Sequence, residues 1–72
     1  MEKAKFFTEL QDALELSNNL NESSPIALSS LHVLSVIALV DENFDKQIKA
    51  GDLKQVNTVN DLMTIIGIEN FS

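Results

Sequence analysis

The apolar residues of segment 30–44 recur at helical spacing, and this pattern constrains the fold more than any other feature of the chain. At about 100° per residue they form one narrow stripe, which is typical of a helix that packs against a core. The stripe comprises Val33, Val36, Ile37, Val40 and Phe44. Ser29 or Ser30 can cap this helix, because a serine oxygen accepts a hydrogen bond from a free amide of the first turn. A helix from about residue 30 to about Phe44 is therefore predicted.

A second strip of apolar residues lies on another side of the same predicted helix. It is formed by Leu31, Leu34 and Ala38, about 120° or more away from the first stripe, and it is bordered by Asp41, Glu42 and Asp45. Leu39 fits neither group. Either the long segment before the helix covers this strip, or the strip meets another protein, since exposed apolar surface edged with charge usually marks an interaction site.

The N-terminal segment predicts another amphipathic helix, from Glu2 to Leu16. Its apolar positions are Phe6, Phe7, Leu10, Ala13 and Leu14. No clear capping residue precedes it, so fraying of its first turn is expected.

Near the C-terminus, Thr58-x-x-Asp61 has the form of a capping box, which predicts a last helix. Apolar residues follow at helical spacing: Val59, Leu62, Met63 and Ile66. Gly67 suits the C-terminal cap, and Ile68 is placed for the apolar contact that often accompanies such a cap.

Two connections complete the layout. Residues 17–29 are rich in Ser and Asn and contain the only proline, so they predict a long loop, which Leu20, Ile26 and Leu28 would anchor in an ordered position. A helical turn opened by Ser24-Pro25 is the alternative. After Ile48, Gly51-Asp52 predicts a break and a cap before a brief helical turn with Leu53 and Val56. No β alternation is present. The fold class is therefore all-α, a small four-helix bundle of three main helices and one short helix in a single domain over residues 1–72.

Length and charge limit the function. Seventy-two residues bury only about 60% of their unfolded surface, which leaves no room for a deep catalytic cleft. Five basic against eleven acidic side chains give a net charge of −6, which disfavours nucleic acid and anionic membranes and favours basic protein partners. There is no cysteine, no apolar run of membrane-spanning length and no signal-peptide pattern, so a cytoplasmic protein is expected.

The usual catalytic and metal patterns are incomplete. Ser30 and the only histidine, His32, stand two positions apart and do not face each other on a helix, which argues against a serine hydrolase. A glycosidase carboxylate pair would need a substrate cleft. Asp41-x-Asn43-x-Asp45 echoes a calcium-binding loop, but Lys46 stands where that loop requires glycine. Weak calcium binding by a helix-loop-helix remains an alternative.

Taken together, Ser29-Ser30-Leu31, then Phe44, Asp45, Ile48 and Thr58-Val59, closely resemble the acyl carrier protein family. The similarity runs without a gap from about Leu28 to Ile66. The family motif is Asp-Ser-Leu at the start of the second helix, and its serine carries 4′-phosphopantetheine. Ser30 occupies the place of that serine.

The resemblance implies a carrier, not an enzyme. It would hold acyl or polyketide-type intermediates as thioesters on a 4′-phosphopantetheine arm attached to Ser30. Its partners would be a phosphopantetheinyl transferase and ketosynthase, acyltransferase and related acyl-processing enzymes, and we expect a monomer. The positions that match the partner surface of the family are Leu31, Leu34, Ala38, Asp41, Glu42, Asp45 and Ile48. A different class is a degenerate carrier fold that serves only as an interaction module.

The chain departs from the family around the attachment site. Ser29 replaces the usual aspartate, the upstream glycine is absent from Ala27-Leu28, and His32 and Ser35 stand where acids are frequent. Negative charge near Ser30 is thus reduced, which predicts a specialised carrier of fatty-acid or secondary-metabolite synthesis. Ser29 is a rival attachment point, although the ungapped spacing to Phe44 favours Ser30.

Overall fold

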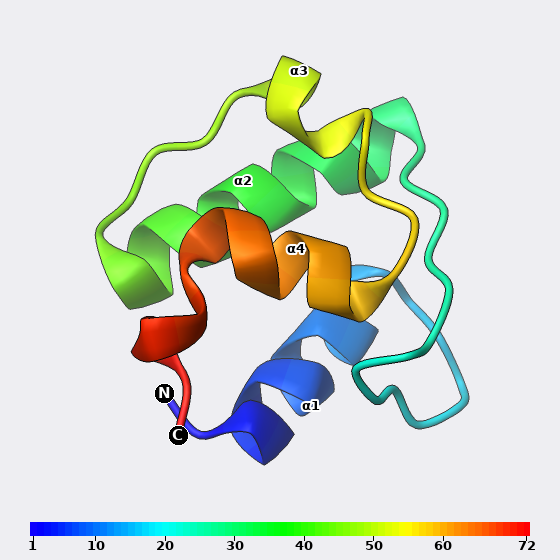
Figure 1. Ribbon diagram of the computed structural model, residues 1–72. Helices are drawn as coiled ribbons and strands as arrows, with labels where there is room; N and C mark the ends of the chain where they lie inside the picture. The colour runs from blue at the N-terminus through cyan, green and yellow to red at the C-terminus, as the bar shows by residue number, and fades with distance from the viewer.

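The protein is built from four α-helices and a short 3₁₀ helix, as a computed structural model of all 72 residues shows. The elements are α1 (Lys3–Ala13), α2 (Ser30–Phe44), α3 (Ala50–Leu53), α4 (Val59–Ile66) and η1 (Ile68–Asn70). Long α2 lies behind α4, and the short α3 lies above them, near the N-terminal half of α2 (Figure 1). The predicted all-α bundle with one short helix is confirmed. None of the helices combines the length and apolar composition needed to cross a bilayer.

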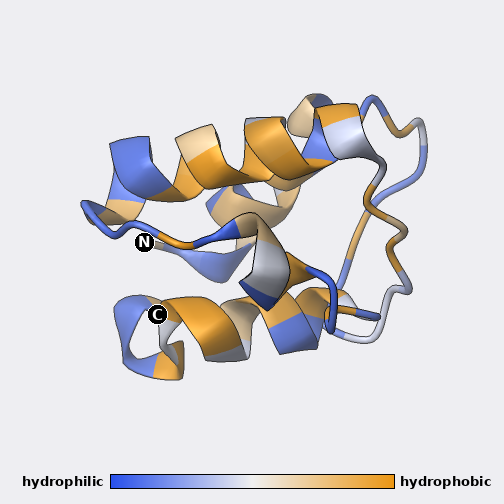
Figure 2. Cartoon of the chain, turned by 90° about the horizontal axis from the view of Figure 1, so that it is seen from above, coloured by the Kyte–Doolittle hydropathy of each residue, from blue (hydrophilic) through white to orange (hydrophobic).

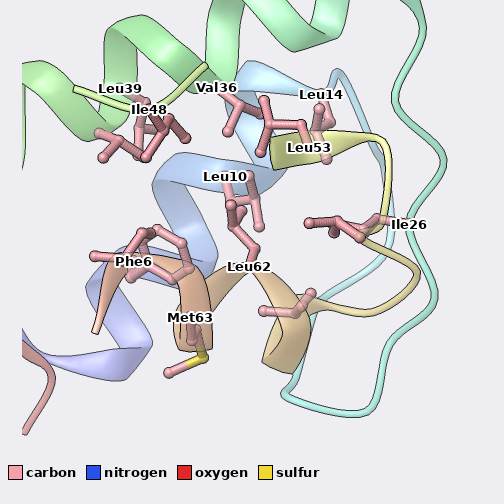
Figure 3. Packing of buried hydrophobic residues seen from close by; sticks show 14 of the residues in the cluster. Phe6, Leu10, Leu14, Ile26, Val36, Leu39, Ile48, Leu53, Leu62 and Met63 are labelled. Atoms are coloured by element: carbon pink, nitrogen blue, oxygen red, sulfur yellow. The ribbon is translucent and has the colours of Figure 1, made fainter. Parts of the chain in front are cut away.

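One hydrophobic core is shared by all four α-helices and by the connections between them. Figure 3 shows side chains of α1, α2 and α4 converging on it, with Leu53 and Ile48 closing one side. Its fifteen buried residues are Phe6, Leu10, Leu14, Leu20, Ile26, Val36, Leu39, Val40, Ile48, Leu53, Val56, Val59, Leu62, Met63 and Ile66. Removing these side chains from water supplies most of the driving force for folding.

The stripe predicted for α2 faces this core. Val36 and Val40 are buried, while Val33, Ile37 and Phe44 are half-buried and pack against it. Leu39, which fitted neither predicted group, is also buried. The reason is that α2 contacts α1 as well as α3, so its buried face is wider than a single stripe.

Helix α1 is shorter than predicted: it ends at Ala13 and not at Leu16. Leu14 still reaches the core, but Glu15 takes a left-handed backbone conformation with φ of 56°, which stops the helix. At the other end Glu2 makes no side-chain capping bond, as expected from the absence of a capping residue.

The long first loop is anchored by backbone pairing with the segment before α4. The Ile26 N–H donates to the Asn57 carbonyl at 2.9 Å, and the Val59 N–H donates to the Ser24 carbonyl at 3.0 Å. Leu20 and Ile26 are buried and Leu28 is half-buried against the core, so the predicted anchors are confirmed. Pro25 forms an isolated bridge with Thr58 instead of opening a helical turn. The loop therefore runs beside the first turn of α4 and leaves the outer face of α2 uncovered.

The capping box predicted for α4 is present. Thr58 Oγ1 accepts from the Asp61 N–H at 3.3 Å, and Asp61 Oδ2 accepts from the N–H groups of Asn57 and Thr58 at 3.0 and 3.1 Å. Hydrogen bonds from Asn57 and then Thr58 stabilise the carboxylate and lower the pKa of Asp61 below its usual 3.8.

One detail at the C-terminal side of the bundle differs from the prediction, namely the apolar contact expected of Ile68. Gly67 caps α4 with φ of 113°, as expected, but Ile68 is 48% exposed. Phe71 packs on the core instead, with its ring centroid 4.9 Å from that of Phe6 and 5.2 Å from that of Phe44.

The short helix α3 begins earlier than the predicted break. Gly51 lies inside α3, and Asp52 caps it by accepting a hydrogen bond from the Lys49 N–H at 3.1 Å. Leu53 and Val56 are buried, as expected of the residues that anchor this turn.

Candidate functional site

The two adjacent serines at the N-terminus of α2, Ser29 and Ser30, have different structural roles. Ser29 is the N-cap residue, with extended backbone angles, and its Oγ accepts from the His32 N–H at 3.3 Å. Its carbonyl accepts from the Val33 N–H at 2.8 Å, which is the first hydrogen bond of the helix. Ser30 is the first residue with helical geometry. Capping therefore falls to Ser29 and leaves the Ser30 side chain free of that role.

The Ser30 hydroxyl is available for chemistry. The residue is exposed, and its Oγ makes no hydrogen bond within the chain. The first turn of α2 contains no acidic residue, so the positive end of the helix dipole is not neutralised there. Free amides and this dipole favour a negative group attached at such a position.

A hollow of about 440 Å³ adjoins Ser30, between α2 and α3. Apart from Ser30, its walls are Leu28, Val33, Leu34, Ala50 and Lys54. Four of these are apolar, and Lys54 is the only charged one. The site is therefore a hydroxyl at the edge of an apolar hollow with one cation.

A second hollow of about 400 Å³ lies further along the same side of α2. Leu34 lines both hollows, so the two are neighbours on the α2–α3 side of the molecule. Ala38, Asp41, Ile48 and Lys49 are among the residues of the second.

Most residues predicted as the partner surface are exposed. Leu31 and Leu34 are each 67% exposed, and they stand three positions apart on one helix, so they form a pair of neighbouring exposed apolar side chains. Ala38, Asp41, Glu42 and Asp45 are exposed too. The ribbon of α2 is hydrophobic over most of its length and hydrophilic over its last turn (Figure 2). The apolar strip and its acidic border therefore lie on the surface.

Ile48 and Glu42 are placed differently from the rest. Ile48 is only 7% exposed and belongs to the core, so it contributes no more than part of the wall of the second hollow. Glu42 lines a third hollow, between α1 and α2, with Glu9 and Asp12. The structure thus brings Leu34, Ala38, Asp41 and Ile48 together around the second hollow. Glu42 lines the third hollow instead, and Ala38 is the predicted residue that the two hollows share.

The alternative of a calcium loop finds no support in the local geometry. Asp41 and Asn43 lie within α2, and Asn43 Nδ2 donates to the Leu39 carbonyl at 2.9 Å. A calcium loop would need this segment to leave the helix. No group of three or more histidine or carboxylate side chains is placed to hold a metal ion.

Lys54 is the site residue that the sequence did not indicate. It follows a four-residue helix, too short for a periodic pattern, and it is 24 positions from Ser30 in the chain (54 − 30). Only the packing of α3 beside α2 brings it to the hollow. The signal in the sequence was its positive charge, since this chain has only five basic residues against eleven acidic ones.

Comparisons with known proteins add no relative: no protein-family model, no curated protein and no solved structure matches this chain. The function must therefore be argued from the site itself.

Proposed function

We propose that the protein is an acyl carrier protein that holds acyl or polyketide-type intermediates as thioesters on a 4′-phosphopantetheine arm attached to Ser30. The observation that carries the proposal is the exposed Ser30 hydroxyl, free of intrachain hydrogen bonds, at the first position of α2. Ser29-Ser30-Leu31 resembles the attachment motif of the acyl carrier protein family, and this similarity continues without a gap to Ile66. The resemblance therefore supports Ser30 as the attachment point.

The residues around Ser30 fit the phosphate of such an arm. The diester formed on Ser30 Oγ would stand beside the free amides of the first turn of α2, where negative charge is favoured. The nearby hollow has the apolar walls and the single lysine described above. When bound, the arm supplies the thiol on which acyl groups are carried, and this chain has no cysteine of its own.

In the modification, the chain is the acceptor and the transferase the catalyst. A new P–O bond joins Ser30 Oγ to the phosphorus that bears pantetheine, as the pyrophosphate bond of coenzyme A breaks. Adenosine 3′,5′-bisphosphate leaves, and the hydroxyl proton passes to a base of the transferase. This chain contributes an accessible oxygen and a positive helix end, and no catalytic group of its own is required.

Ser29 is the poorer attachment point. Its Oγ accepts the capping hydrogen bond from the His32 N–H. Modification there would disturb the cap, and loss of a serine cap costs about 1 kcal/mol. Ser30 has no such bond to lose.

The outer face of α2 supports docking to acyl-processing enzymes. Exposed Leu31 and Leu34 supply apolar contacts, and Asp41, Glu42 and Asp45 supply negative charge. Attraction between acids and a basic partner surface speeds encounter and sets orientation. A small patch of this kind suits a carrier that each enzyme must release.

Mass spectrometry of the purified chain tests the proposal. Incubation with coenzyme A and a broad-specificity phosphopantetheinyl transferase should add one phosphopantetheine group, mapped to Ser30 in fragments. Ser30→Ala should remove the mass gain and Ser29→Ala should keep it. If no transferase, including those of the native host, modifies the folded chain, the carrier function is rejected and the exposed face of α2 indicates an interaction module.

A further inference from the structure

Lys54 is the only charged residue that lines the hollow beside Ser30. The other two hollows contain carboxylates: Asp41 in one, and Glu9, Asp12 and Glu42 in the other. No acid lines the hollow at Ser30, so no carboxylate of its walls neutralises the ammonium group of Lys54.

The ammonium group of Lys54 is also free of other partners. It takes part in no ion pair and no hydrogen bond within the chain, and the residue is exposed. By contrast, Lys46 Nζ donates to the Ile66 carbonyl at 2.9 Å, and Lys3 Nζ lies 3.3 Å from Glu22 Oε1. Lys54 is therefore available to bind an anion from outside.

The backbone of Lys54 is well anchored although its side chain is free. The residue directly follows Leu53, which is 2% exposed and packs into the core, and it closes α3. The start of the lysine side chain is thus held beside the hollow. A lysine ammonium acts as a mobile point charge that binds phosphate without demanding a fixed geometry.

We propose that Lys54 is a positioning residue that binds the phosphodiester on Ser30 and so holds the beginning of the arm over the hollow between α2 and α3. This inference rests on the proposed function. It concerns the phosphate, whose single negative charge complements both Lys54 and the positive end of α2. An exposed pair of this kind changes the population of the bound arrangement about two- to fivefold, and salt screens it.

The test uses the full chain carrying the arm, in four forms: wild type, Lys54→Gln, Lys54→Arg and Lys5→Gln. Lys5 is exposed on α1 and lines none of the hollows, so its variant is the control for loss of one positive charge. Each form is modified to completion, checked by intact mass and compared with its unmodified form by NMR. The readouts are the ³¹P shift of the diester, relative to the same protein unfolded in urea, and the backbone amide shifts of residues 50–54.

In the wild type, we expect attachment of the arm to shift the amides of α3 and the ³¹P resonance to differ from its unfolded value. Lys54→Gln should lose most of both effects, Lys54→Arg should retain them, and Lys5→Gln should match the wild type. High salt should reduce the effects in the wild type, in Lys54→Arg and in Lys5→Gln towards the values of Lys54→Gln, because each of these three forms keeps a cation at position 54. Equal shifts in wild type and Lys54→Gln would overturn the role of Lys54 while leaving the carrier function intact. Absence of any mass gain in the wild type would overturn the carrier function itself, and this inference with it.

Discussion

The side-chain oxygen of Ser29 accepts a hydrogen bond from the backbone N–H of His32 at 3.3 Å. This bond caps α2 and makes Ser29 a structural residue, whereas its neighbour Ser30 has no bonded partner. Ser29 therefore stabilises the start of α2, and the side chain of Ser30 has no such structural role.

Substituting each serine should separate these roles. Ser29→Ala removes the cap and should lower the free energy of unfolding by about 1 kcal/mol. Ser30→Ala should change it by no more than about 0.5 kcal/mol, because the exposed hydroxyl contacts nothing that the fold needs. Urea unfolding followed by circular dichroism measures both. A larger loss of stability in Ser30→Ala than in Ser29→Ala would contradict this division.

The capping box of α4 should make the stability of the folded protein depend on pH. The pKa of Asp61 is lowered in the folded protein, chiefly by the hydrogen bond from Asn57 and then by that from Thr58. Its contribution is fully present above the unfolded pKa near 3.8 and is lost as the pH falls through the lower, folded value. Asp61→Asn should flatten this part of the curve of melting temperature against pH. An unchanged slope below pH 4 would show that other carboxylates carry the acid sensitivity.

The side chain of Glu9 is expected to destabilise the folded protein. Its Oε2 is buried without a hydrogen-bond partner, and Asp12 and Glu42 line the same hollow. Glu9→Gln removes the repulsion between carboxylates and should raise the free energy of unfolding by about 0.5–1 kcal/mol. Exposed Glu69 offers the control, since Glu69→Gln removes the same charge away from that hollow. A stabilisation of equal size in both variants would point to net charge alone.

Leu34 should matter for partners and little for folding. It is 67% exposed and lies between the two hollows on the α2–α3 side. Leu34→Ala should change the free energy of unfolding by no more than about 0.5 kcal/mol. Loss of an apolar contact at the centre of an interface should lower kcat/KM of phosphopantetheinyl transfer about tenfold. Leu16→Ala, a truncation of another exposed leucine, serves as the control and should transfer at the wild-type rate.

Local patterns were sufficient to place the three main helices and the caps of α4, although α1 ends before the predicted Leu16. The spacing of apolar residues in α1, α2 and α4 follows from the helical period, and the Thr58–Asp61 box and Gly67 act within one turn of the backbone. Interactions between residues three or four positions apart depend on the helix alone, so they are visible in the sequence. The second apolar strip of α2 was visible in the same helical period, as was its acidic border. Its exposure was one of the two alternatives that the sequence left open.

The tertiary structure decided what lies beside each helix. Leu39 is buried because α1 packs on that side of α2, and Phe71 replaces Ile68 at the core because η1 turns the chain back towards Phe6. The long loop leaves Leu31 and Leu34 uncovered because its backbone pairs with the segment before α4. Lys54 lines the same hollow as Ser30 only because α3 packs beside α2. The sequence by itself determined which segments are helical, since this depends on neighbours along the chain, but it left both Ser29 and Ser30 open as the cap of α2. Only the folded structure decided that Ser29 is the cap and what surrounds Ser30, because contacts between distant segments depend on how the helices fill their common core.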